Sequence, residues 1–294
     1  MLRILITGGT GLIGRHFINH FVNEYHFTVL TRNIDHALSH LPENVELIDH
    51  LPNKNTFDVI LNLAGEPIVD HRWSTKHKDK LRISRLGITQ QLIDMILRSS
   101  MRPKVFLSGS AIGIYGDTGA NVQTEQSTIE ADDFGHELCQ QWEALALEAA
   151  SSVRVVLLRT AVVLASDGGA LSKMSTPFRF GLGATLGSGK QWMSWIHITD
   201  MVRAIEHCIA QEEIKGAVNF SAPNAVTNYA FTHELAKALD RPSLLNMPAF
   251  ALKLIMGERA SLMLASQNVF PKRLVDSGFE FHFPHIDEAL ADLF

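Results

Sequence analysis

A glycine-rich turn near the start of the chain is the first place where residue types and spacing suggest chemistry. Residues 7–14 read TGGTGLIG, follow an apolar run and open a helical pattern. Gly8, Gly11 and Gly14 are spaced three apart, which permits a tight turn with exposed amide N–H groups that can bind phosphate. We therefore predict a dinucleotide-phosphate site formed by Gly8, Thr10, Gly11, Leu12, Ile13 and Gly14. The alternative is a glycine-rich turn that binds no ligand.

The end of the next apolar run indicates which dinucleotide is bound. Residues 29–33 read VLTRN, so Arg32 stands where an NAD site usually carries Asp or Glu, and the first acid is Asp35. A guanidinium can bind a 2′-phosphate through two hydrogen bonds, whereas a carboxylate would repel it. The sequence therefore predicts NADP rather than NAD as the cofactor. The alternative is that Arg32 is a solvated surface charge.

The chain around these residues alternates short apolar runs with longer helical patterns. Strands are expected at Arg3–Thr7, Phe27–Thr31, Val45–Ile48, Asp58–Leu63, Lys104–Ser108 and Val153–Arg159. Helices are expected at Leu12–Asn23, Lys76–Ser99 and Phe134–Ala150. Several strands are apolar almost throughout, as expected when helices cover both faces of a sheet. This alternation predicts an α/β fold with a Rossmann-like, doubly wound parallel sheet.

The pattern changes after residue 165, where closely spaced glycines punctuate a loop. Beyond it the sequence indicates a segment Trp192–Ile196, a helix Thr199–Gln211, a strand Ala217–Ser221, a helix Tyr229–Leu239 and a helical run Ala249–Ala265. We therefore expect an NADP-binding domain at residues 1–165 and a smaller C-terminal α/β lobe at 166–294, with the chain crossing between them. The cleft between the two is the expected ligand site.

Composition and charge limit the classes of function. The 294 residues are 46% hydrophobic and 19% charged, with a formal net charge of −5. This composition is typical of a packed globular protein, and the absence of a Lys or Arg run argues against nucleic-acid binding. The longest apolar runs fall short of the ~20 residues that span a bilayer, so no membrane partner is expected.

The two cysteines, Cys139 and Cys208, lie in apolar helical patterns. We interpret them as buried free thiols rather than a disulfide, and two cysteines are too few for a metal cluster. Because strand residues begin at Leu2, no signal peptide is expected, and the predicted location is cytoplasmic. The alternative is a processed organellar transit segment.

Several segments together resemble one superfamily. The glycine turn, residues 61–66 (LNLAGE) and residues 108–111 (SGSA) are similar to the extended short-chain dehydrogenase/reductase superfamily. More narrowly, the chain resembles the YfcH-type "epimerase family protein" group of NAD-dependent epimerase/dehydratase-like proteins. That resemblance rests on residues 63–68 (LAGEPI), 72–73, 84–85, 181–183 (GLG), 186–192 (LGSGKQW), 195–197 (WIH), 271 and 278–279. The block from about Pro242 resembles the group's own C-terminal domain, to which no role is attached.

The resemblance implies an NADP-binding fold whose physiological reaction is unassigned. By position, it implies cofactor contacts at Thr31, Arg32, Leu63, Ala64, Arg85 and Val162. Leu63 and Ala64 also end an expected strand, where ligands of open α/β sheets bind. Arg85 shares a helical face with Leu81 and Leu92, so its charge points toward the protein body and needs an anion there. A cofactor phosphate is one such anion, and an internal carboxylate is the alternative.

The catalytic residues of the superfamily are only partly present. Members that move hydride use a Tyr and a Lys four residues apart on one helix, together with a Ser or Thr. Ser110 matches the Ser, but Phe134 and Leu138 stand at the other two positions. Both continue an apolar stripe with Trp142, so we interpret them as packing residues. Phenylalanine has no proton to give, so the usual Tyr–Lys pair is absent.

Three polar residues are nevertheless retained as catalytic candidates: Ser110, Tyr115 and Glu66. Tyr115 either flanks the nicotinamide or is a structural tyrosine in a turn, and Glu66 would carry a proton or clamp a polar group in the cleft. His197 is interpreted as part of a helix-capping network. Lys190 would contact a substrate anion or belong to a flexible surface loop. His136 would act near the missing Tyr–Lys pair or occupy a solvated helix position.

These features predict an NADP-dependent oxidoreductase or epimerase-like protein acting on a small polar substrate, with a sugar nucleotide as one candidate. Hydride transfer needs only the cofactor's chemistry and orientation by the protein, so weak proton catalysis slows it without forbidding it. The alternative is a non-catalytic NADP(H)-binding redox sensor or regulatory protein, which the missing Tyr–Lys pair favours. The polar loops at 108–115 and 187–195 favour the enzyme.

Overall fold

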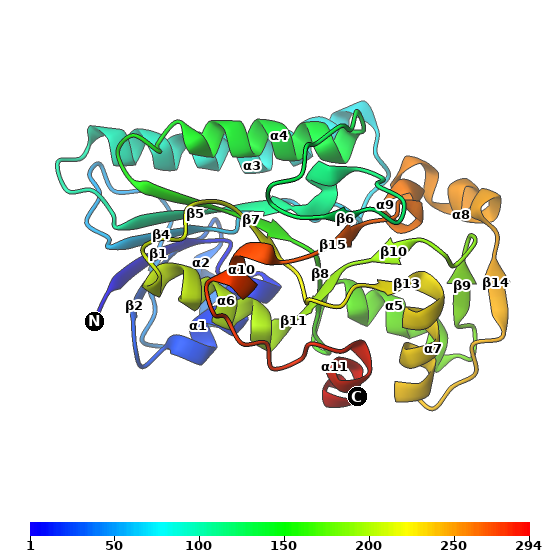
Figure 1. Ribbon diagram of the computed structural model, residues 1–294. Coiled ribbons are helices and arrows are strands. Elements are labelled where there is room, and N and C mark those ends of the chain that lie inside the picture. The colour runs from blue at the N-terminus through cyan, green and yellow to red at the C-terminus, as the bar shows by residue number, and fades with distance from the viewer.

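A seven-stranded parallel sheet forms the centre of the computed structural model, which describes residues 1–294 (Figure 1). Its strands are β1 (Arg3–Thr7), β2 (His26–Leu30), β3 (Glu46–Ile48), β4 (Val59–Asn62), β5 (Val105–Ala111), β7 (Arg154–Thr160) and β12 (Gly216–Phe220). Their order is β12-β7-β5-β4-β1-β2-β3, and every neighbouring pair is parallel. The chain therefore winds outward from β1 in both directions, and the predicted Rossmann-like α/β fold is confirmed.

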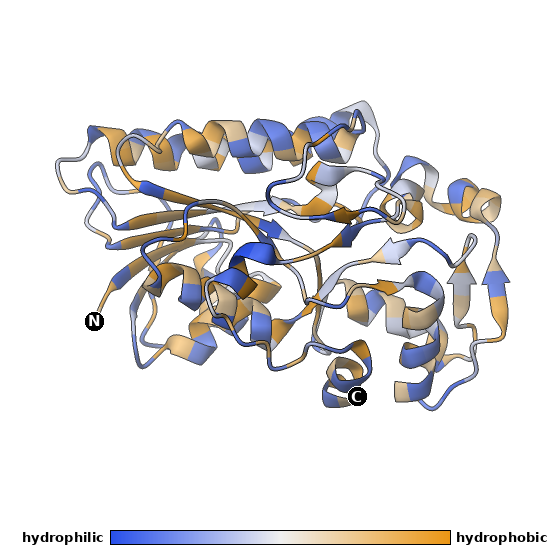
Figure 2. Ribbon diagram, viewed as in Figure 1, coloured by the Kyte–Doolittle hydropathy of each residue, from blue (hydrophilic) through white to orange (hydrophobic).

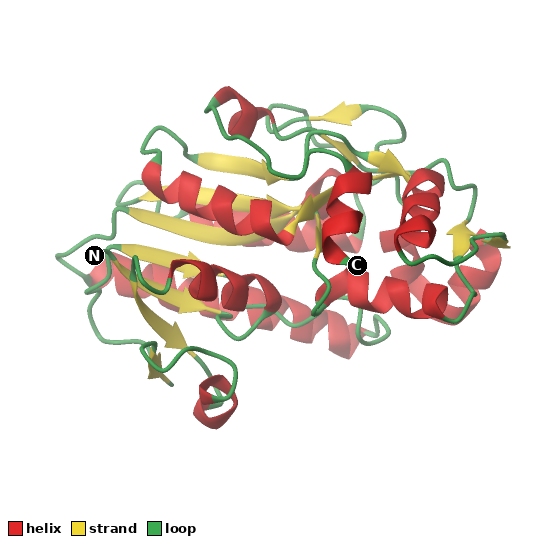
Figure 3. Ribbon diagram, turned by 90° about the horizontal axis from the view of Figure 1, so that it is seen from below, coloured by secondary structure: helices red, strands yellow, loops and turns green.

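Helices cover both faces of this sheet (Figures 1 and 3). One face carries α3 (Thr75–Arg98) and α4 (Phe134–Leu147), and the other carries α1 (Leu12–Phe21), α6 (Ile198–Ala210) and the short α10 (Lys272–Asp276). Side chains of β1 alternate between two cores, because Ile4 and Ile6 pack beneath α1 and α6 while Leu5 packs with residues of α3 and α4. This double coverage explains why the strands are almost wholly apolar (Figure 2).

The predicted strands and long helices agree with the structure to within a few residues. The strand predicted to end at Ser108 continues to Ala111, and the helix predicted to reach Ala150 ends at Leu147. Helix α2 (Ile34–Leu38) was not predicted, because it is only five residues long. The side chain of Asn33 caps it by accepting a 2.9 Å hydrogen bond from the amide of His36.

The remaining elements form a smaller lobe beyond the carboxyl edge of the sheet, on the right in Figure 1. Its helices include α5 (Gly169–Arg179), α7 (Asn228–Ala238), α8 (Ala249–Met256), α9 (Ser261–Leu264) and α11 (Ile286–Leu293). Short strand pairs complete it: β8 (Val162–Leu164) with β11 (Trp195–His197), β9 (Ala184–Leu186) with β14 (Leu245–Met247), and β10 (Trp192–Met193) with β13 (Val226–Thr227). The chain crosses between lobes, since β12 and α6 return to the main sheet.

The helical run expected at 249–265 is divided. Gly257, with a φ of +63°, ends α8 and begins the 3₁₀ turn η2 (Gly257–Ala260), which leads into α9. Cys139 and Cys208 are buried and unpaired, as predicted, and burial raises the pKa of each thiol to about 12. None of the helices combines the length and apolar character needed to cross a membrane. No group of three or more His, Cys, Asp or Glu side chains is placed to hold a metal ion.

Candidate functional site

The glycine turn joins β1 to α1 at the carboxyl edge of the sheet, where close backbone approach excludes side chains. Gly8 has a φ of +71°, and a Cβ at this position would lie 2.7 Å from the main-chain carbonyl of Leu63. A Cβ at Gly14 would lie 2.6 Å from the carbonyl oxygen of Gly8. Both obstacles are backbone atoms, so they cannot swing aside as a flexible side chain would. The turn therefore requires glycine at both positions.

The start of α1 leaves amide groups available to a ligand. Gly11 is the N-cap and provides no side-chain acceptor, and the amide of Arg15 is the one that bonds back to the Gly11 carbonyl, at 2.9 Å. The amides of Leu12 and Ile13 precede it in the first turn, where no intrahelical acceptor exists. Thr10 lies half-buried next to them. A ten-residue helix with an uncapped first turn fits a phosphate group.

Arg32 lies beside this turn, because its strand pairs with the strand that leads into the glycines. Thr7 of β1 is in register with Leu30 of β2, two residues before Arg32. The Arg32 side chain is exposed and makes no hydrogen bond or ion pair with the protein. Thr31, next to it, bonds through its hydroxyl to the main chain of Asn33. The guanidinium of Arg32 is thus available to an anion at the carboxyl edge.

The segment after β4 forms the other side of the turn. The amide of Leu63 donates to the carbonyl of Thr7 at 3.0 Å, and the amide of Ala64 donates to the Thr7 hydroxyl at 3.2 Å. That hydroxyl donates in turn to the buried side chain of Asn62 at 2.6 Å. These bonds fix the main chain at Leu63 and Ala64 directly against Gly8. The structure therefore brings Leu63 and Ala64 together with the glycine turn.

Arg85 of α3 is half-buried and has no carboxylate partner. Its guanidinium donates to the carbonyl oxygens of Leu81 and Glu66, at 3.2 and 3.1 Å, and lies 5.4 Å from the ring centroid of Trp142. Burial lowers the pKa of Arg85. The alternative of an ion pair with an internal carboxylate is therefore wrong. A half-buried cation that donates only to carbonyl oxygens and forms no ion pair fits a site for an anionic ligand.

Glu66 is separated from the other two catalytic candidates. Its carboxylate accepts a 2.5 Å hydrogen bond from Lys80, and this bond lowers the pKa of Glu66. The charges of His77 and Arg32 act in the same direction. No hydrogen bond or ion pair connects Glu66 with Ser110 or Tyr115. Its role as a proton carrier stays a prediction.

Ser110 belongs to a buried polar row that crosses three neighbouring strands. Ser110 of β5, Arg159 of β7 and Asn219 of β12 are in register with one another. The Ser110 hydroxyl donates to Oε1 of Glu143, on α4, at 2.6 Å. Arg159 binds both carboxylate oxygens of Glu143, through Nε and Nη2, at 2.9 Å each. Burial alone would lower the pKa of Arg159, but the hydrogen bond and the charge of Glu143 raise it above the ordinary value.

Tyr115 closes the other end of this row. It lies in the 3₁₀ turn η1 (Ile112–Tyr115), where its hydroxyl accepts from Nη1 of Arg159 at 2.9 Å and donates to Oδ1 of Asn219 at 2.7 Å. Burial raises the pKa of Tyr115. Ser110 and Tyr115 are therefore connected through Glu143 and Arg159, and both are nearly inaccessible to solvent. These contacts favour the structural interpretation of Tyr115, while its role toward a ligand stays a prediction.

Sequence reasoning missed Glu143 and Arg159. The available signal was the Arg that follows the apolar run VVLL within a central strand, and a Glu inside the helical pattern WEALA. A charge within a strand covered on both faces needs a buried partner. The strand register decides that Arg159 lies beside Ser110 and Asn219, and this register is known only from the folded chain.

The remaining candidates take different positions. Phe134 and Leu138 pack with Leu81, as predicted. His197 caps α6 by accepting from the amide of Thr199 at 3.1 Å, so the capping interpretation is confirmed. The solvated position predicted for His136 is wrong, because its ring is buried and Nδ1 lies 2.7 Å from the carbonyl oxygen of Ile114.

Val162 and Lys190, the last two candidates, both lie near the short strands beyond the main sheet. Val162 begins β8, and its amide donates to the carbonyl of Ser194 at 3.2 Å. Lys190 is exposed, and its side chain makes no hydrogen bond or ion pair with the protein. The contact of Val162 with a cofactor and that of Lys190 with a substrate stay predictions.

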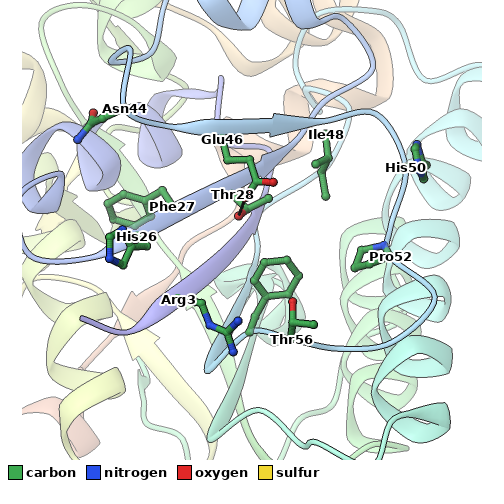
Figure 4. Close-up of a pocket in the computed structure, with 11 residues that line it drawn as sticks. Arg3, His26, Phe27, Thr28, Asn44, Glu46, Ile48, His50, Pro52 and Thr56 are labelled. Carbon is green, nitrogen blue, oxygen red and sulfur yellow. Dashed lines mark hydrogen bonds between the residues drawn. The ribbon is translucent and has the colours of Figure 1, made fainter.

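Two hollows lie away from all of these residues. A hollow of about 360 Å³ lies along β3 and at the amino ends of β1 and β2, where Thr28 donates to Glu46 at 2.8 Å (Figure 4). A second, of about 460 Å³, lies beside α7 and is lined by Tyr229, His233 and Lys237, among others. The first faces the opposite edge of the sheet from the glycine turn. Neither contains a predicted site residue, so neither is part of the candidate site.

Comparison with known proteins places these features in a family. Residues 4–221 match the model of the NAD dependent epimerase/dehydratase family, and residues 247–293 match a domain of unknown function, DUF1731. The chain is 38% identical over 299 residues to the chloroplastic epimerase family protein SDR39U1 homolog of Arabidopsis thaliana, covering 98% of this chain and 86% of that protein. It is 36% identical to epimerase family protein SH2119 of Staphylococcus haemolyticus, covering 100% and 99% of the two chains.

Solved structures agree with this. The crystal structure of human epimerase family protein SDR39U1 (isoform 2) with NADPH has a TM-score of 0.90, at 30% identity and 99% coverage of both chains. A nucleoside-diphosphate sugar epimerase from Corynebacterium glutamicum has a TM-score of 0.79 at 29% identity, covering 99% of this chain and 58% of that one. The resemblance to the epimerase family protein group of the extended short-chain dehydrogenase/reductase superfamily is confirmed. The chain belongs to the NAD dependent epimerase/dehydratase family.

Proposed function

We propose that the chain is an NADP(H)-dependent oxidoreductase or epimerase-like enzyme acting on a small polar substrate. The observation that supports the cofactor most is a pair of arginines, Arg32 beside the glycine turn and Arg85 beside Gly65. Arg32 is free of protein partners, and Arg85 is held among carbonyl oxygens without a carboxylate. Two guanidinium groups without an ion-pair partner, one of them beside an uncapped helix start, suit a dinucleotide that carries an additional phosphate. The human relative was crystallised with NADPH.

Different residues of this chain would bind different parts of the dinucleotide. The first-turn amides of α1 would bind the pyrophosphate, and Arg32 would bind the 2′-phosphate through two hydrogen bonds. Leu63, Ala64 and Val162 would contact the rest of the cofactor, which supplies or accepts a hydride when bound. Residues 1–165 would thus hold the cofactor, and 166–294 would form the substrate side.

The substrate class to test first is a sugar nucleotide. The Corynebacterium glutamicum neighbour is a nucleoside-diphosphate sugar epimerase, and it covers nearly all of this chain. The exposed Lys190, in the loop between β9 and β10, would contact the substrate's phosphates. Ser110 would approach the reacting oxygen, but its single proton is directed to Glu143. To donate to a substrate carbonyl, the hydroxyl must first turn away from that carboxylate.

A second candidate function is a non-catalytic NADP(H) sensor. Phe134 and Leu138 replace the usual proton donor and its Lys, and the hydroxyls of Ser110 and Tyr115 are engaged within the protein. The two functions differ in whether the bound cofactor is consumed. Decay of bound NADPH fluorescence on adding sugar nucleotides or simple carbonyl compounds would support the enzyme. Tight binding without oxidation across a broad panel would support the sensor.

The cofactor assignment is tested by titrating NADPH and NADH into the native protein and into Arg32→Ala. Loss of charged hydrogen bonds to the 2′-phosphate should weaken NADPH binding by about 1.5–3 kcal/mol and leave NADH binding unchanged. Arg102→Ala is the matched control, since Arg102 is also exposed but precedes β5 at the opposite edge. Equal affinity of the native protein for NADPH and NADH would refute the assignment.

A further inference from the structure

The C-terminal region returns to the first domain through one short segment, Ser266–Phe270. Its strand β15 (Asn268–Val269) pairs with β6 (Val122–Gln123), which follows the turn η1. The amide of Phe270 extends this pairing by donating to the carbonyl of Gln123 at 2.8 Å. The segment therefore lies against the loop that leads away from Tyr115.

The same segment is bonded on its other side to the small lobe. The amide of Gln267 donates to the carbonyl of Trp192 at 2.9 Å. The hydroxyl of Ser194 donates to the Gln267 carbonyl and accepts from the amide of Val269, at 2.8 Å each. Ser266–Phe270 is thus inserted between the Tyr115 loop and the segment Trp192–Ser194, which comprises β10 and the residue that follows it.

The side chain of Gln267 holds both ends of η1. Its Nε2 donates to the carbonyl oxygen of Ile112 and to that of Gly116, at 3.1 Å each. Ile112 begins the turn and Gly116 ends it, so one amide group uses both of its N–H donors to fix the segment that contains Tyr115. No other side chain donates to these two carbonyls.

A second bond connects the segment with the buried polar row. Nδ2 of Asn219 donates to the carbonyl of Phe270 at 3.0 Å, while Oδ1 of the same side chain accepts from Tyr115. From Tyr115 the hydrogen bonds continue through Arg159 and Glu143 to Ser110. The segment therefore contacts this row directly at Asn219 and, through Gln267, holds the turn that carries its tyrosine.

We propose that Ser266–Phe270 is the element through which the C-terminal region holds the Ser110–Tyr115 wall of the site in place, with Gln267 as a positioning residue. The proposal rests on the proposed function in one respect, namely that this wall borders the nicotinamide end of the cofactor. It gives the DUF1731 region a role in completing the site. Gln267 acts only through the main chain of η1 and does not itself touch the reacting atoms.

The test compares Gln267→Met with Gln191→Met in the full chain. Gln191 is a matched control, because its Nε2 also donates to two carbonyls, those of Leu186 and Met263, away from η1. Amide hydrogen exchange over residues 112–116 requires no ligand. We expect faster exchange in Gln267→Met than in the native protein and in Gln191→Met. If Gln267→Met does not fold, Gln267→Asn, which keeps the amide but is too short to reach both carbonyls, replaces it.

Two nucleotide probes then separate this proposal from the proposed function. Adenosine 2′,5′-bisphosphate contains only the adenosine end, and its affinity should be the same in all variants. The nicotinamide fluorescence of bound NADPH should fall in Gln267→Met, with about a threefold to tenfold loss of NADPH affinity. Unchanged fluorescence and unchanged exchange at 112–116 would overturn the positioning role. Failure of the native protein to bind the bisphosphate would instead overturn the NADP assignment. In that case the hydrogen exchange of residues 112–116 alone would decide whether Gln267 positions η1.

Discussion

Arg159 and Glu143 form a bidentate ion pair in the interior, with both N–O distances at 2.9 Å and both side chains 8% exposed. The pair joins the central sheet to α4 directly behind Ser110. The two charges neutralise one another, and the carboxylate also accepts a hydrogen bond from the Ser110 hydroxyl. Removal of one partner therefore leaves the other charged, buried and unpaired.

We expect Arg159→Met to lower the free energy of unfolding by about 3–5 kcal/mol, measured by urea denaturation. The double variant Arg159→Met with Glu143→Leu should recover part of that loss, because no charge is left buried. Lys272→Met is the control, since Lys272 pairs with Asp276 on the surface and its loss should cost less than about 1 kcal/mol. If Arg159→Met and Lys272→Met lowered the free energy of unfolding equally, the buried pair would have no special stabilising role.

Gly14→Ala and Gly87→Ala should have opposite effects. A Cβ at Gly14 meets the main chain of Gly8 at 2.6 Å, so this variant should lose NADPH binding and stability together. A Cβ at Gly87, within α3, meets no atom within 4 Å. Gly87→Ala should therefore stabilise the protein by roughly 0.5–1 kcal/mol, because alanine loses less conformational freedom in a helix. Thermal unfolding measures the stability of the two variants, and titration measures their NADPH affinity. If Gly14→Ala bound NADPH as tightly as the native protein, the turn would not be the phosphate site.

Arg85→Met tests whether the buried guanidinium serves an anion common to both dinucleotides. We expect NADPH and NADH affinity to fall by similar amounts, about 1.5–3 kcal/mol, because the pyrophosphate is shared. This differs from Arg32→Ala, which should affect NADPH alone. Methionine keeps the apolar stem against Trp142, so packing is largely retained. Fluorescence titration of both nucleotides gives the answer, and unchanged affinities would show that Arg85 serves only to hold the carbonyls of Leu81 and Glu66.

His197 should make the protein less stable as the pH falls. Burial lowers its pKa below the ordinary value of 6.5, against the opposing charges of Asp292 and Asp200. The unfolded chain therefore binds the proton more readily, and stability present above about pH 6.5 is lost as the pH falls toward the folded-state pKa. His197→Asn keeps a capping acceptor for α6 but has no titrating ring. Its free energy of unfolding should decline less between pH 7 and pH 5, and equal slopes would contradict this origin.

The main sheet was predictable because its signals are local. Each central strand is a short apolar run, and the long helices carry apolar stripes that need no knowledge of their neighbours. The glycine turn was predictable for the same reason, since its three spaced glycines follow β1 directly, although the backbone that Gly8 faces belongs to Leu63. The divided helix at 249–265 was harder, because its apolar residues continue across the break at Gly257.

The sequence alone determined the strand–helix alternation, the glycine turn, the position of Arg32 and the absence of the Tyr–Lys pair, because each depends on residues near one another in the chain. Only the tertiary structure showed that Ser110 donates to Glu143, that Arg85 has no carboxylate partner and that Gln267 holds η1. The two hydrogen bonds join residues that are 33 and 155 positions apart in the chain. The state of Arg85 depends on the absence of a carboxylate within ion-pair distance. Strand register and helix packing bring such residues together, and neither can be predicted from the spacing of residues along the chain.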